Sequence, residues 1–147
     1  MLENPSLTTR VVIGKSIGFG LGLIGLIVIP FLWPDSGWME RIAFLFWYTT
    51  LGAFVGLVGV MTWHPLLRIP MPWWFSSTLI GAWMNFVLTL FIYDRLAEMM
   101  LELPVGSGLF QSPFWFVAEG AIVGLLIGYF ATRFGGEGPA TIQKEIY

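Results

Sequence analysis

Residues 16–34 read SIGFGLGLIGLIVIPFLWP, a run of 19 residues without a charged side chain. A helix of about 20 apolar residues crosses the hydrocarbon core of a bilayer, which is roughly 30 Å thick. A helix on the surface of a soluble domain keeps one polar face, and this run has none. The run therefore predicts a transmembrane helix over residues 11–33.

Three further charge-poor intervals follow along the chain. The interval from Arg41 to His64 encloses 22 residues, and the interval from Arg68 to Asp94 encloses 25. A third, from Glu102 to Arg133, encloses 30 residues with one charge, Glu119. Strands of a membrane barrel are about 10 residues long and alternate in polarity, unlike these runs. We therefore expect an all-α integral membrane protein, a compact bundle of four transmembrane helices over residues 11–33, 42–63, 73–95 and 113–134.

The composition supports a membrane environment and excludes several functions. Hydrophobic residues make up 56% of the chain and charged residues 11%, whereas a soluble domain has about 25% charged residues. A net charge of -2 argues against binding to nucleic acid, which needs a basic face. The chain has no cysteine and one histidine, so we expect no cofactor, no metal site and no catalytic residues.

Basic residues predict the orientation. One side of the predicted bundle holds Arg10, Lys15, Arg68, Arg133 and Lys144, and the other side holds only Arg41 and Arg95. By the positive-inside rule, both termini are expected in the cytoplasm, with the protein in the cytoplasmic (inner) membrane. The chain then divides into four parts. These are an N-terminal tail (1–10), a first transmembrane hairpin (11–68), a second transmembrane hairpin (69–134) and a flexible C-terminal tail (135–147). Residues 96–103 predict a short amphipathic helix on the outer membrane surface.

Two segments resemble each other internally. Residues 46–57 and 114–125 are identical at seven of twelve positions, at an offset of 68. The first helices of the two hairpins share only Ile17-Gly18 and Ile80-Gly81, at an offset of 63. Two interpretations remain open: a duplicated two-helix hairpin, or convergence, because glycine and large apolar residues recur in packed membrane helices.

Small residues recur four positions apart in every predicted helix. Such spacing keeps the small residues on one helix face, where helix backbones can approach closely in a membrane. The faces predict tight packing within the bundle, or contact with another protein or another copy of the chain. The candidate packing residues are Gly14, Gly18, Gly22, Gly52, Gly56, Gly81, Gly120, Gly124 and Gly128.

Glu119 is a carboxyl group expected well inside a predicted span, six residues into the fourth. Ionisable groups at such depth are costly and are candidates for function. Counting along the helices places Asn85, Thr49 and Thr50 at a similar depth, so we expect an intramembrane polar cluster of these four residues. Its interpretations are an interhelical hydrogen-bond cluster, a proton- or cation-linked site, or a contact with a partner subunit.

His64 has no carboxylate near it in the predicted topology, because the acids lie towards the other side. We therefore expect a protein that is not an enzyme, and a membrane enzyme acting on lipid is the least favoured class. The leading expectation is a non-enzymatic accessory, assembly or scaffold protein that packs through small-residue helix faces. Its expected partners are the lipid bilayer and either other membrane protein subunits or further copies of itself. The alternative is a homo-oligomeric channel or transporter for an ion or small solute, lined by Glu119 and Asn85.

Overall fold

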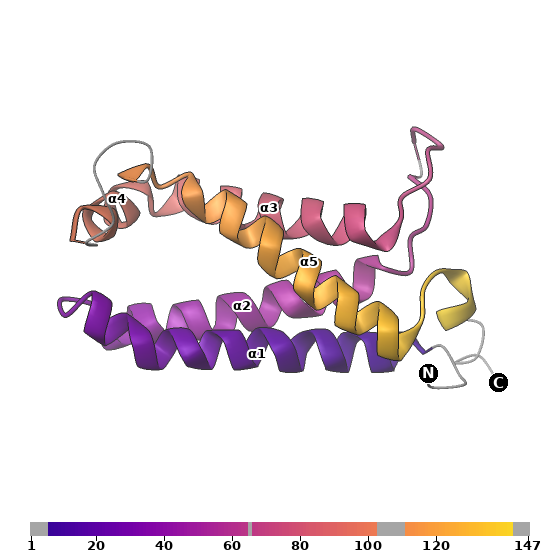
Figure 1. Cartoon of the computed structure of the whole chain (residues 1–147), viewed down its shortest axis with the longest axis horizontal. Helices are drawn as coiled ribbons and strands as arrows, with labels where there is room; N and C mark the ends of the chain where they lie inside the picture. The colour runs from indigo at the N-terminus through magenta and orange to yellow at the C-terminus, as the bar shows by residue number, and fades with distance from the viewer. Residues whose placement is uncertain (1–5, 65, 103–110, 143–147) are drawn as a thin grey trace.

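The computed structural model describes residues 6–64, 66–102 and 111–142, and its α-helices in this part of the chain form a bundle (Figure 1). Four helices are long and apolar enough to cross a membrane. A shorter helix, α4, lies at one end of the bundle. The helices are α1 (Leu7–Leu32), α2 (Trp38–Val58), α3 (Trp73–Phe91), α4 (Tyr93–Glu102) and α5 (Trp115–Gly135).

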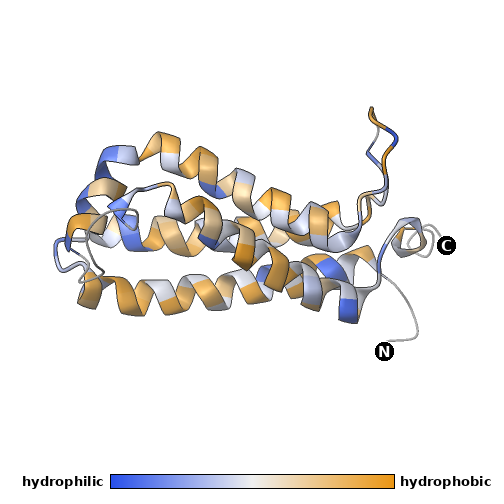
Figure 2. Ribbon diagram, turned by 45° about the horizontal axis from the view of Figure 1, so that its top comes forward, coloured by the Kyte–Doolittle hydropathy of each residue, from blue (hydrophilic) through white to orange (hydrophobic). Residues whose placement is uncertain are grey.

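The predictions of a helical bundle and of four helices long and apolar enough to cross a membrane are confirmed, with shifted ends. α1 begins four residues before residue 11 because the side chain of Ser6 accepts a hydrogen bond from the backbone N–H of Thr9 and caps the helix. α2 begins at Trp38, where the carboxylate of Glu40 accepts the backbone N–H of Gly37 at 2.8 Å. Figure 2 shows hydrophobic residues along the long helices and hydrophilic residues gathered mainly near their ends.

The short helix predicted over residues 96–103 corresponds to α4, and residue 103 lies outside the described residues. α4 begins at Tyr93, directly after α3 ends. Leu96 of α4 is fully buried against Trp33 and Phe44, so α4 packs on the first hairpin as well as continuing from α3. We call this end of the bundle the α4 end, and the opposite end, where the described residues begin at Ser6 and end at Ile142, the termini end (Figure 1).

The backbones of α1 and α2 touch through glycine. A Cβ atom on Gly14 would overlap the carbonyl oxygen of Gly52, and one on Gly18 would overlap that of Tyr48. A Cβ atom on Gly22 would lie 2.8 Å from the carbonyl oxygen of Leu45. Side chains larger than hydrogen therefore do not fit along this contact, which gains dispersion energy from close backbone approach.

The backbones of α3 and α5 touch in the same way. A Cβ atom on Gly81 would overlap the carbonyl oxygen of Gly120, and one on Gly124 would overlap that of Ser77. A Cβ atom on Gly128 would overlap the hydroxyl of Ser77. The small faces of the two hairpins are thus occupied within the chain.

The contacts give a different alignment of the two hairpins from the one that the sequence suggested. Gly52 lies against Gly14 and Gly18, and its counterpart Gly120 lies against Gly81 and Asn85. In the second hairpin, Gly81 therefore corresponds to Gly14 of the first hairpin. The sequence comparison, at an offset of 63, had paired Gly81 with Gly18, which lies one helical turn further along α1. The sequence could not distinguish these alignments because a shift of four residues leaves the small face unchanged.

Arg10 connects the two hairpins at the termini end. Its side chain is fully buried, and Nε donates to the carbonyl oxygen of Gly56 at 3.1 Å. Nη1 donates to the hydroxyl of Thr132 at 3.1 Å and to the carbonyl oxygen of Gly136. Gly56 and Thr132 lie in the last turns of α2 and α5, and Gly136 directly follows α5. Carbonyl groups at helix ends lack partners within the helix.

The predicted flexible tail from residue 135 instead packs on the bundle as far as residue 142. The carboxylate of Glu137 accepts the backbone N–H of Trp73 at 2.9 Å and so caps α3, and the N–H of Gly138 donates to the carbonyl of Gly59. A 3₁₀-helix, η2 (Pro139–Thr141), follows, and its Thr141 is fully buried. The glycines that suggested flexibility serve this turn, since Gly136 and Gly138 have positive φ angles. Residues 143–147 lie outside the described residues.

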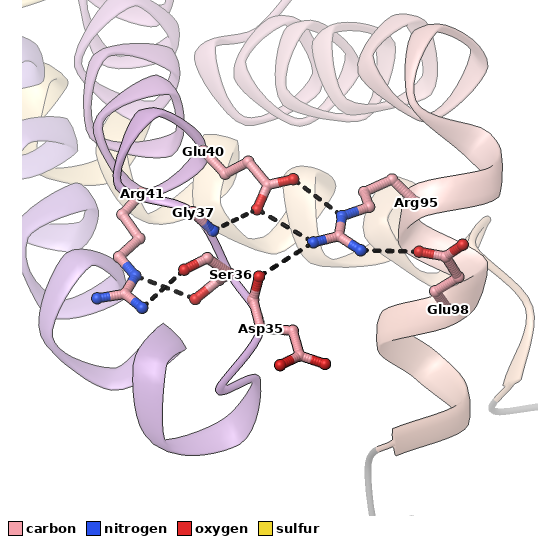
Figure 3. Close-up of polar contacts among 7 residues, drawn as sticks. All are labelled: Asp35, Ser36, Gly37, Glu40, Arg41, Arg95 and Glu98. Carbon is pink, nitrogen blue, oxygen red and sulfur yellow. Dashed lines mark hydrogen bonds and ion pairs between the residues drawn. The ribbon is translucent and has the colours of Figure 1, made fainter.

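Arg95 connects the hairpins at the α4 end (Figure 3). Its guanidinium forms ion pairs with Glu40 of α2 and Glu98 of α4, each at 2.8 Å, and lies 4.3 Å from the ring centroid of Trp33. The hydrogen bond to Glu40, and to a smaller extent the hydrogen bond to Glu98, raise the pKa of the Arg95 guanidinium above its ordinary value. Arg41 instead bonds the hydroxyl and carbonyl of Ser36 within its own turn.

Replacement of Gly52 by alanine tests the backbone contact. The added methyl group would overlap the carbonyl oxygen of Gly14, so we expect Gly52→Ala to lower the free energy of unfolding by about 1–3 kcal/mol. Gly20→Ala is the matched control in α1, because its Cβ would meet no atom within 4 Å. Thermal unfolding in lipid nanodiscs measures both variants, and equal melting temperatures would show that the backbones do not touch at Gly52.

Candidate functional site

A polar cluster joins α2, α3 and α5 inside the spans, and we use this name for Trp47, Tyr48, Asn85 and Glu119. Asn85 is fully buried, and its amide Nδ2 donates to Glu119 Oε2 at 2.7 Å. The hydroxyl of Tyr48 donates to the same oxygen at 2.8 Å. The indole of Trp47 donates to Asn85 Oδ1 at 2.9 Å. Glu119 and Asn85 are thus brought together, as the depth count along the helices suggested.

Thr49 and Thr50 do not belong to the polar cluster, and their predicted membership is corrected. The hydroxyl of Thr49 donates to the carbonyl of Leu45, and that of Thr50 donates to the carbonyl of Phe46, both at 2.8 Å. A threonine in a helix returns its short side chain to the carbonyl four residues earlier, so it does not need a partner on another helix.

Trp47 and Tyr48 take the places expected for the threonines. Sequence reasoning considered carboxyl, amide and threonine hydroxyl groups inside the spans and did not consider aromatic residues as hydrogen-bond donors there. The available signal was their position: both lie within two residues of Thr49 in the sequence, at a depth similar to that of Glu119. Buried tyrosine and tryptophan side chains usually place their polar atom on a partner, which a carboxylate and an amide supply here.

A crevice between the first hairpin and α5 opens beside Glu119. It has a volume of about 370 Å³, and apolar side chains of α1, α2 and α5 form most of its walls. Leu21, Ile24, Val28 and Leu32 of α1 form one wall, facing Glu119 on α5. α5 meets α1 at the termini end through Arg10 and diverges from α1 towards the α4 end, and the crevice lies between these two helices (Figure 1).

Glu119 keeps hydrogen-bonding capacity towards the crevice. Its Oε2 atom accepts both hydrogen bonds of the polar cluster, and no described residue donates to Oε1. Glu119 is one of the residues that line the crevice, so Oε1 is the carboxyl oxygen left for a molecule bound there. The arrangement can therefore accept a hydrogen bond from a further molecule in the crevice.

The described residues provide no catalytic arrangement around Glu119. Its neighbours are a phenol, an amide and apolar side chains, without a nucleophile and base in hydrogen-bond contact. His64 lies in the loop at the termini end, where its Nδ1 accepts the backbone N–H groups of Leu66 and Leu67 at 3.3 and 3.1 Å. No group of three or more potential metal ligands occurs among the described residues.

Comparison with models of protein families, with curated proteins and with solved structures finds no match to this chain.

The hydrogen bond from Tyr48 to Glu119 can be tested by Tyr48→Phe. An interhelical hydrogen bond in a membrane contributes about 0.6 kcal/mol on average and up to about 1.7 kcal/mol, so we expect Tyr48→Phe to lower the free energy of unfolding by that amount. In a Glu119→Leu background, the same change should have a smaller effect, because its partner is already absent.

Tyr129→Phe is the control for this experiment. The Tyr129 ring contacts Trp73 and Phe130, but its hydroxyl donates no hydrogen bond to the described residues. Chemical denaturation in nanodiscs should leave this variant unchanged. An equal loss for Tyr48→Phe in both backgrounds would contradict the cluster, since the two side chains would then act independently.

Proposed function

We propose that this chain is a non-enzymatic accessory or assembly protein of the membrane, which docks on a neighbouring membrane protein through the loop between α2 and α3. The observation that carries the proposal is an ordered loop, residues 59–64 and 66–72, that extends away from the bundle with its largest apolar side chains exposed (Figures 1 and 2). We call this segment the projecting loop.

Hydrogen bonds hold the projecting loop in one shape. Trp63 and Pro70 form an antiparallel bridge, and the N–H of His64 donates to the carbonyl of Ile69 at 2.9 Å. The N–H of Met71 donates to the carbonyl of Thr62 at 2.7 Å. The apolar side chains at the tip are therefore presented on a supported backbone, which lowers the entropic cost of binding.

The backbone at Arg68 favours a protein partner over insertion into lipid. Arg68 has a φ of 50°, in the left-handed region that residues other than glycine rarely occupy. Such strain costs about 1–3 kcal/mol and is concentrated at functional sites. A loop that only dips into lipid needs no defined backbone, whereas docking on a shaped protein surface does.

The exposed side chains at the tip fit an apolar groove on the partner. Leu66 is 86% exposed and Leu67 is 66% exposed, and Trp63 is exposed beside them. Large aromatic and aliphatic side chains act as anchors at the centres of protein interfaces.

We place the projecting loop on the cytoplasmic side of an inner membrane in this proposal. The supporting argument is the distribution of basic residues, which puts the loop and both termini on the positive side.

We also propose that the two hairpins arose by duplication. The equivalent glycine contacts of α1 with α2 and of α3 with α5 support this origin.

We do not extend the proposal to a channel formed by several copies of the chain. A channel of that kind needs Glu119 and Asn85 on a surface that faces other copies. Asn85 is fully buried, and both side chains bond within one chain to residues of α2. The glycine faces are likewise in contact with each other inside each hairpin.

Replacement of both tip leucines by serine tests the docking function. The protein with Leu66→Ser and Leu67→Ser is extracted gently at native expression level and studied by native mass spectrometry. We expect the wild-type chain to travel with a foreign membrane protein in fixed stoichiometry and the double variant to lose it, because the anchors are removed.

The matched control carries Met39→Ser and Leu101→Ser, two equally exposed apolar residues at the α4 end. This control should keep the partner, which distinguishes loss of the anchors from a general loss of apolar surface. Retention of the partner by the loop variant, or a wild-type chain that travels alone or only with its own copies, would contradict the proposal.

A further inference from the structure

The crevice beside Glu119 has the dimensions of a lipid chain. Its α1 wall runs from Leu21 to Leu32, eleven helical steps, or about 16 Å at 1.5 Å per residue. Half of a hydrocarbon core is about 15 Å. The crevice therefore runs along one leaflet, from the α4 end of the bundle towards the bilayer centre.

The volume of the crevice, about 370 Å³, is that of a small-molecule site. Pockets that bind small molecules start at about 300 Å³ and are mostly apolar with a few placed polar groups. The crevice matches that description, with Glu119 and Tyr48 as its polar side chains.

The depth of Glu119 limits the polar group that can reach it. Glu119 lies four residues after Trp115, the first residue of α5, or about 6 Å along the helix. A charged phosphate drawn to this depth would lose its water and meet a carboxyl group, which is unfavourable. A neutral hydroxyl next to the acyl chains loses little and can donate to Oε1, the atom to which no described residue donates.

We infer that the crevice between α1, α2 and α5 binds one acyl chain of a neutral lipid whose free hydroxyl donates a hydrogen bond to Glu119. A diacylglycerol has this chemistry. Tyr48 and Asn85 hold the carboxyl group in place through Oε2, which directs Oε1 to the ligand. This binding site is separate from the projecting loop, at the other end of the bundle.

Two glycines of α1 provide a matched pair of variants. Gly25 lines the crevice, and a Cβ on it would meet only the side chain of Ile29, at 3.8 Å. Gly25→Leu therefore places a side chain in the crevice without disturbing the backbone contacts. Gly20 does not line the crevice, and a Cβ on it would meet no atom within 4 Å, so Gly20→Leu is the control.

The experiment uses the full chain in phosphatidylcholine vesicles with a small proportion of a diacylglycerol that carries a photoreactive diazirine on one acyl chain. After illumination, mass spectrometry locates the labelled residues. We expect labelling of the α1 segment from Leu21 to Leu32 and of Val123 in the wild type and in Gly20→Leu. We expect Gly25→Leu to lose most of this labelling while keeping the melting temperature of the control.

A second probe tests the hydroxyl without altering the protein. It is the same diacylglycerol with its hydroxyl acetylated, so that it keeps both chains and lacks the donor. We expect the free hydroxyl to increase labelling of the crevice about threefold or more, the effect of one intramembrane hydrogen bond. Glu119→Leu should abolish this difference between the probes.

Equal labelling by the two probes, or equal labelling of Gly25→Leu and Gly20→Leu, would overturn the inference. The result is independent of the docking proposal, because Gly25→Leu leaves the projecting loop intact and should keep any partner that the loop binds.

Discussion

The guanidinium of Arg10 lies at the ends of α2 and α5, and the arrangement of the two hairpins depends on it. The carbonyl groups in a last helical turn lack partners and carry partial negative charge, so a buried cation beside two such ends satisfies both. The hydrogen bonds of Arg10 to Gly56, Thr132 and Gly136 cross 46 to 126 residues of sequence. Within each hairpin, the glycine contacts hold the two helices together. Between the hairpins, the hydrogen bonds of Arg10 hold α1 and α2 to α5 at the termini end.

The crevice follows from that constraint. Arg10 joins α1 to α5 at the termini end, and Arg95 joins the hairpins at the α4 end through Glu40. Between these ends, α5 diverges from α1, and the gap contains apolar side chains and one carboxyl group. The polar cluster holds Glu119 on the wall of this gap through Tyr48 and Asn85. The loop between α2 and α3 extends away from the bundle, and Glu137 and Gly138 bond to the two ends of that loop (Figure 1).

The sequence predicted the features that depend on local patterns and missed those that depend on distant contacts. Charge-free intervals located the four long helices, because lipid requires apolar length whatever the packing. Counting residues along the predicted helices indicated that Asn85 lies near Glu119. The same count selected Thr49 and Thr50 instead of Tyr48, because it did not consider how far each side chain reaches. Arg10 entered the sequence analysis only as a basic residue near the first helix. Its role was not predictable, because its acceptors are backbone atoms whose position depends on the packing of both hairpins.

The most direct test of this account is the thermal stability of Arg10→Met in nanodiscs beside Lys15→Met, which removes an exposed charge from the same helix. Arg10→Met leaves two carbonyl groups and one hydroxyl without their donor, and each unsatisfied group costs about 1–3 kcal/mol. The account predicts a loss of about 3 kcal/mol or more for Arg10→Met and an unchanged Lys15→Met. Equal stability of the two variants would contradict it, because the hairpins would then be held together without Arg10.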